Sequence, residues 1–349
     1  MGIAQETVEK RLPPIEYFSV SSHPKRKGFR TLYLARLQQG HQHLKRRIAT
    51  FNEAAMVDPF WGLAVLSIVL SPDQQYYCIT GASQSIIGQI GQPPFKTIDD
   101  AFYGRFSPDS RYLLGYRALS GNLELVDCRR RQTRRLTEAN STLDRDASKE
   151  YFYHFGWYPD GRAVWFRLDW ITPTGPLPER YYRLELTTGR KQVLGAAQSR
   201  QLHTDWQLLN PRYRYCSPFL QGNRLYAYSR DGRWRVRVEP YYPYSVDHPE
   251  DRARVYVEQR GGVSRLVVQA ERHGWAKVYP QDVSVDGRWV LLIVERWGVD
   301  GNGQRVLQGE LVAVEVARRT VLYPLVKGGK RVAQFVRTNQ LEPAYWFSK

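Results

Sequence analysis

Histidine and cysteine are among the side chains in this sequence that could ligate a metal or act as nucleophiles. His41 and His43 flank one residue, which places both on one side of a strand. A structural zinc site needs four ligands, and no CxxC pair or further histidine cluster supplies the others. Cys78, Cys128 and Cys216 are odd in number and far apart, which argues against a disulfide framework. The sequence therefore predicts no metal site and no cofactor.

Motifs that position a catalytic group are also absent from the sequence. There is no G-x-S-x-G elbow, and Gly301–Gly303 lacks the strand, loop and helix context of a phosphate cradle. His154 lies in the apolar run YFYHFGW, where we interpret it as a wall residue. We expect a protein without catalytic activity. A lyase or hydrolase acting on an anionic carbohydrate is a weaker alternative, since a basic surface would suit its substrate.

The charge of the chain is its strongest chemical signal. The formal net charge is +17, from 51 Lys and Arg against 34 Asp and Glu, and arginine dominates the basic residues. Such a surface attracts anions, and guanidinium groups bind carboxylates and phosphates alike. The charge therefore indicates an acidic protein partner or a nucleic acid without choosing between them.

The N-terminal residues contain no apolar segment of the kind found in export signals, and the longest apolar run, residues 63–70, is too short to span a bilayer. We expect a cytoplasmic protein with no transmembrane segment, or an exported one if a signal has been removed. Peripheral contact with a membrane surface stays open. Residues 1–14 are expected to form a tail and residues 15–349 one folded domain.

A repeated pattern predicts the fold. From Phe106 the sequence reads FSPDSRYLLGYRALSGNLELVDCRRRQTRRLT, in which SPD is a turn signal and short apolar runs alternate with further turns. The pattern predicts four antiparallel strands, the unit of a β-propeller blade. The same order recurs around four other aspartates: Asp73, Asp160, Asp231 and Asp286.

These units resemble the repeats of TolB-like propellers, in which an apolar strand, SPDG and a second apolar strand follow one another. The resemblance covers about residues 61–325 and concerns the fold, because one fold supports many functions. It implies an all-β protein with a single β-propeller, and a β-sandwich is the alternative.

The five turns predict five blades, and the two chain ends predict a sixth. The runs IEYFSVS, TLYLARLQQGH and HLKRRIAT read as three strands of a blade that lacks one. The run RVAQFVRT near the C-terminus is expected to complete it, with PAYWFSK beside it, since closure removes exposed sheet edges. We therefore expect six four-stranded blades, with seven as the alternative if residues 195–223 hide another.

Long connections between second and third strands are expected to form one loop-rich face. They span residues 21–30, 169–180, 239–252 and 296–308. Loops longer than a connection requires often carry binding, and aromatic residues and arginine are typical interface anchors. Packing of the aromatics onto the blades, with solvated charges, is the simpler explanation for any single loop. The predicted partner-binding residues in these loops are Lys25, Arg26, Lys27, Trp170, Tyr241, Tyr242, Tyr244, Arg252, Trp297 and Arg305.

One predicted strand carries three further candidates. In residues 233–238, Arg233, Arg235 and Arg237 alternate with apolar residues and so share one side. Because a buried, unpaired arginine is costly, either acidic residues face them or the strand extends towards a partner. The other arginine clusters, such as residues 129–135, are expected to be solvated edges that guard against aggregation.

The leading hypothesis is a scaffold or linker subunit that docks to an acidic multi-subunit protein assembly through the loop-rich face. Binding of RNA or DNA, with Tyr and Trp as stacking platforms, is the alternative.

Overall fold

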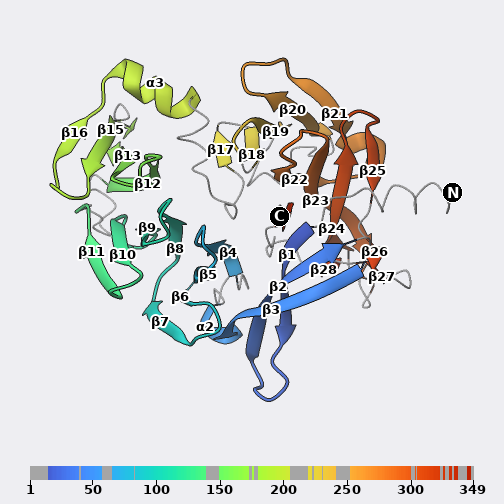
Figure 1. The fold of residues 1–349 in the computed structure, drawn as a ribbon, viewed down its shortest axis with the longest axis horizontal. Coiled ribbons are helices and arrows are strands. Elements are labelled where there is room, and N and C mark those ends of the chain that lie inside the picture. The colour runs from blue at the N-terminus through green and yellow to red at the C-terminus, as the bar shows by residue number, and fades with distance from the viewer. Residues whose placement is uncertain are drawn as a thin grey trace. The chain divides into compact units, whose positions relative to one another are not determined.

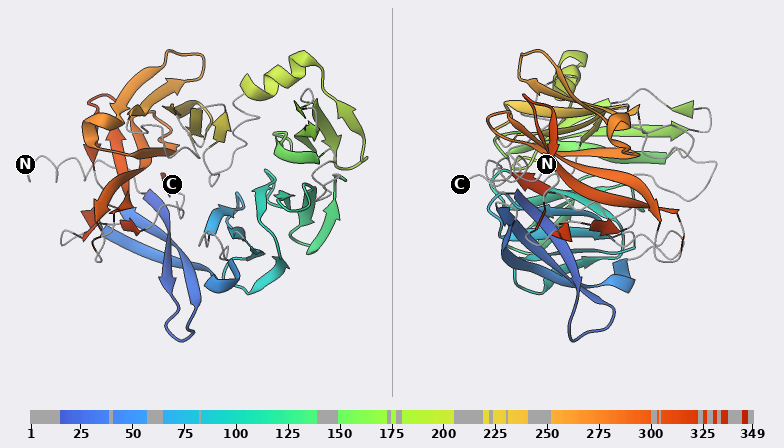
Figure 2. Two further views of the ribbon diagram at one scale, coloured as in Figure 1. Left: turned by 180° about the vertical axis from the view of Figure 1, so that it is seen from behind. Right: turned by 90° about the vertical axis from the view of Figure 1, so that its right-hand side faces the viewer.

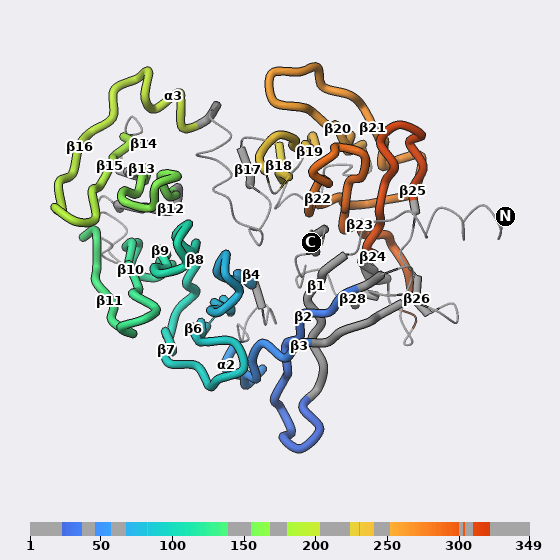
Figure 3. Tube along the Cα trace, viewed as in Figure 1, coloured from blue at the N-terminus to red at the C-terminus, as the bar shows by residue number. Residues whose placement is uncertain are grey.

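The computed structural model describes most of the chain (Figure 3). The chain divides into two compact units, residues 51–216 and residues 1–50 with 217–349. The described residues are 15–38, 41–56, 65–81, 83–138, 149–172, 175–176, 180–204, 219–221, 224–229, 231–240, 252–299, 303, 305–322, 325–326, 330–331, 334–336 and 344–346. None of the helices in these ranges has the length and apolar character needed to cross a bilayer.

Three antiparallel sheets make up the unit of residues 51–216 (Figure 1). In each sheet the strands lie side by side in chain order. The first contains β4 (Val65–Leu70), β5 (Tyr76–Gly81), β6 (Ser85–Gln89) and β7 (Pro94–Ile98). The second contains β8 (Phe102–Phe106), β9 (Tyr112–Arg117), β10 (Leu123–Asp127) and β11 (Gln132–Arg135). The third contains β12 (Lys149–Trp157), β13 (Ala163–Thr172), β15 (Arg180–Glu185) and β16 (Lys191–Val193), with β14 (Gly175–Pro176) beside β13. Helices α2 (Glu53–Met56) and α3 (Ala196–Thr204) flank them in the chain.

The other unit contains both described ends of the chain. One sheet has the order β29 (Ala344–Trp346), β1 (Ile15–Ser22), β2 (Phe29–Gln38) and β3 (His41–Asn52). A second contains β17 (Phe219–Gln221), β18 (Arg224–Tyr228), β19 (Trp234–Glu239), β20 (Arg254–Gln259) and β21 (Arg265–Gln269), followed by the 3-10 helix η2 (Ala270–His273). A third contains β22 (Lys277–Val283), β23 (Trp289–Val299), β24 (Arg305–Glu315) and β25 (Thr320–Leu322), with β28 (Gln334–Val336) beside β24. A small hairpin joins β26 (Leu325–Val326) and β27 (Lys330–Arg331).

Each predicted aspartate turn joins two consecutive strands of its sheet, and the turns share hydrogen bonds that the turn after β18 illustrates. In the turn after β18, the Ser229 hydroxyl donates to Asp231 (2.6 Å) and accepts the backbone N–H of Trp234 (2.9 Å). The Asp231 carboxylate also accepts the N–H of Arg233. The turn therefore satisfies backbone groups that would otherwise lack partners. The Ser to Asp bond recurs at Ser71, Ser107 and Ser284, and the aspartate to N–H bond recurs at Asp73, Asp109, Asp160 and Asp286.

Apolar faces of neighbouring sheets build the cores of both units. One cluster joins the sheets β8–β11 and β12–β16 around Trp157, and a larger one joins β18–β21 to β22–β25 around Trp275. Both indole rings are fully buried. β23 is buried at seven consecutive positions from Trp289. Because a strand covered on both faces must be apolar on both faces, its sequence there is a nearly continuous apolar run.

The all-β propeller prediction is confirmed, but the count of six four-stranded blades is wrong, and so is the alternative of seven. Five four-stranded blades are each formed by one run of the chain: β4–β7, β8–β11, the sheet from β12 to β16, β18–β21 and β22–β25. Three of these sheets carry an added fifth strand. The remaining four-stranded sheet combines the two chain ends, and residues 196–204, in the stretch considered for a seventh blade, form α3.

The pairing of the C-terminal strands also differs from the prediction. The segment 331–338, expected beside the N-terminal strands, contributes β28, which pairs with β24. The strand that pairs with β1 is β29, antiparallel, with Ile15 opposite Trp346. A strand of three residues has too short a sequence pattern to distinguish these two edges, because both offer an unpaired main chain of the same kind.

Candidate binding surface

Two of the expected long loops are extended hairpins in the structure. β1 and β2 pair from Ile15 and Leu37 up to Ser22 and Arg30, so the connection is a turn of six residues, 23–28. β23 and β24 remain paired out to Val299 and Arg305. The β1–β2 hairpin, drawn in dark blue, projects well beyond β3 (Figures 1 and 2). Hydrogen-bonded strands hold such a projection more rigidly than a loop can.

The turn of the β1–β2 hairpin, hereafter the basic tip, presents three exposed cations: Lys25, Arg26 and Lys27. Its backbone is fixed by hydrogen bonds from His23 N–H to the Phe29 carbonyl (2.9 Å) and from Phe29 N–H to the Arg26 carbonyl (3.2 Å). The Arg26 guanidinium lies over the Phe29 ring, 5.5 Å from its centroid. Within the described part of the chain, none of the three cations forms an ion pair. The tip therefore holds unneutralised charge on a defined turn.

The outer part of the β23–β24 hairpin, hereafter the apolar hairpin, carries exposed hydrophobic groups. Trp297 is 53% exposed and Val299 is 64% exposed. Residues two apart in a strand share a side, so the two groups form a short apolar stripe. The predicted residue Arg305 lies opposite Val299 in register, and its side chain lies outside the description.

The arginines of β19 are held by carboxylates of their own sheet. Arg235 Nε binds Glu258 on the neighbouring strand β20, and Arg237 Nε lies 3.2 Å from the same carboxylate. A second ion pair joins Arg237 to Glu239, and Arg233 binds Asp231 in the turn. The sequence left two explanations for these arginines, facing carboxylates or a strand that extends towards a partner, and the structure shows facing carboxylates.

Aromatic rings complete this network on the same side of the sheet. The guanidinium of Arg235 lies 5.0 Å from the ring centroid of Tyr226, and that of Arg237 lies 4.5 Å from Tyr256. Burial raises the pKa of Glu258, but the hydrogen bond from Arg235 and the positive charge nearby outweigh it, so the pKa lies below its usual value. The arginines of β19 are therefore engaged within their own sheet.

The remaining predicted residues are placed only in part. Arg252 is exposed two residues before β20. Trp170 lies in β13, opposite Glu150, with its side chain outside the description. Tyr241, Tyr242 and Tyr244 lie outside the described residues altogether.

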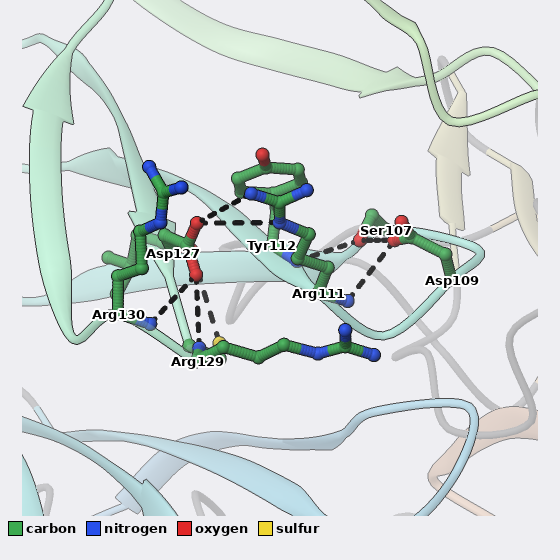
Figure 4. Close-up of polar contacts among 9 residues, drawn as sticks. Ser107, Asp109, Arg111, Tyr112, Asp127, Arg129 and Arg130 are labelled. Atoms are coloured by element: carbon green, nitrogen blue, oxygen red, sulfur yellow. Dashed lines mark hydrogen bonds and ion pairs between the residues drawn. The ribbon is translucent and has the colours of Figure 1, made fainter.

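A basic turn that the sequence analysis assigned to a solvated edge is more ordered than expected. Asp127, at the end of β10, accepts the backbone N–H groups of Arg129 and Arg130 at 3.0 Å each (Figure 4). Its other oxygen accepts the Arg111 guanidinium at 3.3 Å. Partial burial raises the pKa of Asp127, but these donors outweigh it and bring the pKa below its usual value. One carboxylate thereby fixes a turn whose arginines are exposed, with Arg131 over the Phe95 ring and Arg111 over Tyr112.

Acid and nucleophile candidates are buried within the sheets. Burial raises the pKa of the Cys78 thiol to about 12, and burial also raises the pKa of the Cys128 thiol. Asp100 is buried beside Arg117, and burial raises its pKa despite the Leu119 N–H that it accepts at 3.0 Å. Across the ranges described, no group of three or more His, Cys, Asp or Glu side chains is placed to hold a metal ion.

Comparison with known proteins gives a likeness of fold. No protein-family model and no curated protein matches the chain. Among solved structures, a protein described as TolB from Agrobacterium tumefaciens is similar at 14% identity and a TM-score of 0.38, covering 88% of this chain and 95% of that one. A chain of a nidogen–laminin complex is similar at 10% identity and a TM-score of 0.41, covering 91% and 95%. Oligogalacturonate lyase from Vibrio parahaemolyticus is similar at 10% identity and 0.45, covering 90% and 86%. The chain thus resembles TolB-like and other propellers in its fold alone.

Proposed function

We propose that this chain is a non-catalytic β-propeller that acts as a scaffold or linker subunit and docks to an acidic multi-subunit protein assembly. The docking surface consists of the basic tip and the apolar hairpin, which belong to the same compact unit. The observation that carries the proposal is the basic tip itself, where three adjacent cations lie exposed on a hydrogen-bonded turn and form no ion pair with the described residues.

The distribution of carboxylates supports this reading. Several acidic residues are taken up by internal ion pairs, such as Glu124 with Arg117 (3.4 Å) and Glu239 with Arg224 (2.7 Å). Each such pair takes up one cation with one carboxylate, so the net charge of +17 remains among the groups that are not paired internally. Complementary charge speeds encounter and fixes orientation, so an acidic partner is the favoured one.

The apolar hairpin supplies the contact that charge alone does not. Rim charges contribute mainly to association rates, whereas a buried tryptophan at an interface centre commonly contributes about 2 kcal/mol or more. Among the large apolar residues that the structure describes, Trp297 and Val299 are the one pair that lies two apart in a strand with both members more than half exposed. A protein partner with an apolar recess would cover them, and a nucleic acid backbone would not cover Val299 favourably. This favours a protein over the nucleic-acid alternative.

The test compares three forms of the full chain as baits in native extract, followed by titration of the captured partner in purified form. The first is wild type, the second carries Lys25→Glu, Arg26→Glu and Lys27→Glu, and the third carries Trp297→Ala. A charge-matched control changes three exposed arginines of the same unit to Glu. These are Arg288, just before β23, and Arg318 and Arg319, between β24 and β25.

We expect the tip variant to lose about tenfold or more in affinity, Trp297→Ala about thirtyfold, and the control to stay within about threefold. Equal binding by the tip variant and the control would refute the placement of the docking surface. Capture of nucleic acid, with affinity falling steeply with salt for tip variant and control alike, would support the nucleic-acid alternative instead.

A further inference from the structure

The outer strand of the blade β8–β11 is an open sheet edge. β11 is the end strand of its sheet, and all four of its residues are exposed. Among the described residues its one strand partner is β10, with Asp127 opposite Gln132 and Glu124 opposite Arg135. An edge of this kind can accept a further strand unless something prevents it.

The ladder shows which main-chain groups of β11 face outwards. The N–H of Leu136 donates to the carbonyl of Leu123 at 2.8 Å, which fixes this pair as a hydrogen-bonded one. Bonded and non-bonded pairs alternate in an antiparallel ladder, so Arg134 is bonded to β10 as well. The N–H and C=O groups of Thr133 and Arg135 therefore point away from β10, towards the open edge.

The same segment carries a dense positive charge. Five of the seven residues from 129 to 135 are arginine, and all seven are exposed. The two carboxylates nearest in the ladder are already engaged, because Asp127 holds the turn and Arg111, and Glu124 pairs with Arg117. The edge therefore offers hydrogen-bonding groups within a field that no neighbouring carboxylate in the described sheet neutralises.

This charge selects the occupant. A second copy of the chain would bring five arginines against five, which repels, whereas an acidic segment would gain from each of them. We propose that β11 binds an acidic, extended peptide segment of a protein partner by strand addition. Main-chain bonds to Thr133 and Arg135 would supply affinity, and carboxylates beside the arginines would supply specificity.

The inference rests on the proposed function in one respect, that the partner is an acidic protein, but it uses a different surface in the other compact unit. It also differs from simple electrostatic binding. A nucleic acid would contact only the guanidinium groups, whereas strand addition requires the outward N–H of Thr133.

Thr133→Pro separates these possibilities. Proline removes the outward N–H and no bond to β10, and proline is tolerated at sheet edges. Thr133→Val keeps the N–H and is the matched control. A third variant carries Arg134→Glu and Arg135→Glu, and the fourth is the basic-tip variant with Lys25, Arg26 and Lys27 changed to Glu. The probe is a fluorescently labelled eight-residue peptide of alternating Glu and Val, measured by anisotropy in 150 mM salt, about physiological ionic strength. Circular dichroism melts establish that each variant is folded.

We expect wild type, Thr133→Val and the basic-tip variant to bind the peptide alike, Thr133→Pro to bind about fivefold more weakly or worse, and the Arg-to-Glu variant to lose binding. Undiminished binding by Thr133→Pro overturns strand addition, even where the arginine variant fails. Binding of a single-stranded oligonucleotide, but not of the peptide, would overturn it in favour of nucleic acid. If only the basic-tip variant failed to bind the peptide, this inference would be overturned while the proposed function would stand.

Discussion

Removing the charge of Glu258 tests whether the arginines of β19 are structural. Glu258 lies between Arg235 and Arg237, and both guanidinium groups contact its carboxylate. Glu258→Gln keeps the shape of the side chain and one hydrogen-bond acceptor but leaves two cations facing a neutral group. If the network stabilises the blade, this change should lower the free energy of unfolding.

The magnitude follows from burial. Removing one partner of a fully buried ion pair costs about 3–5 kcal/mol, mostly because the other charge is left uncompensated. Here the side chains of Arg235 and Glu258 retain 21% and 10% exposure, and Arg237 keeps its second partner Glu239. Solvent and Glu239 therefore take over part of the compensation. We expect a loss of about 2 kcal/mol, below the range for a dry pair.

Urea unfolding followed by tryptophan fluorescence measures this loss. Glu138→Gln, at an exposed position, is the matched control and should change stability by less than about 0.5 kcal/mol. A double-mutant cycle with Arg235→Gln should show coupling between the two sites. A loss for Glu258→Gln as small as that for Glu138→Gln, with no coupling, would refute a structural role for the network.

The pH dependence gives an independent check. The pKa of Glu258 in the folded protein lies below its ordinary value of 4.5. A carboxyl group with a depressed folded pKa stabilises the protein fully above its unfolded pKa, and this contribution is lost as the pH falls through the folded pKa. The difference in stability between wild type and Glu258→Gln should therefore be constant at neutral pH and shrink below about pH 4.5.

Three further predictions concern packing, thiol reactivity and the repeated turn. Gly115→Ala should destabilise the chain by about 1–3 kcal/mol in urea unfolding, because an added Cβ would lie 2.1 Å from the ring of Phe102; an unchanged midpoint would contradict the close packing. Cys78 and Cys128, buried and with raised pKa, should resist a thiol reagent at pH 8 until the protein unfolds, and rapid labelling of either in native protein would disprove their burial. Ser229→Ala should cost about 1–3 kcal/mol, since the N–H at the start of β19 loses its acceptor, and Ser83→Ala, at an exposed site, should cost far less.

Local chemistry explains which parts of the fold could be predicted from the sequence. The aspartate turns were predicted correctly because the bonds that define them, between Ser, Asp and the following N–H groups, form within six residues. The strands that flank them follow from the apolar runs between turns. The sheets that β28 and β29 join were predicted wrongly. The pairing of β29 with β1 joins residues more than two hundred positions apart, and no local pattern distinguishes that edge from the edge of β24.

The candidate site was less predictable for the same reason. The connections after β1 and β23 were predicted as long loops, yet the flanking strands pair as far as Ser22 with Arg30 and Val299 with Arg305. The partner of Arg235 lies 23 residues away, and only the strand register shows that Glu258 stands opposite it. β11 is an open edge because it is the end strand of its sheet. The repeat pattern predicts the four strands of a blade but not whether a further strand is added at the outer one.

The most direct test of the docking proposal is the affinity of the purified acidic partner for the full chain, titrated with wild type, with the basic tip reversed to Glu, and with Arg288, Arg318 and Arg319 reversed to Glu. Both variants change net charge equally. The proposal predicts tight binding by wild type and by the variant with Arg288, Arg318 and Arg319 reversed, and about tenfold weaker binding by the tip variant. Equal weakening in both variants would show that total charge, and no defined surface, governs association.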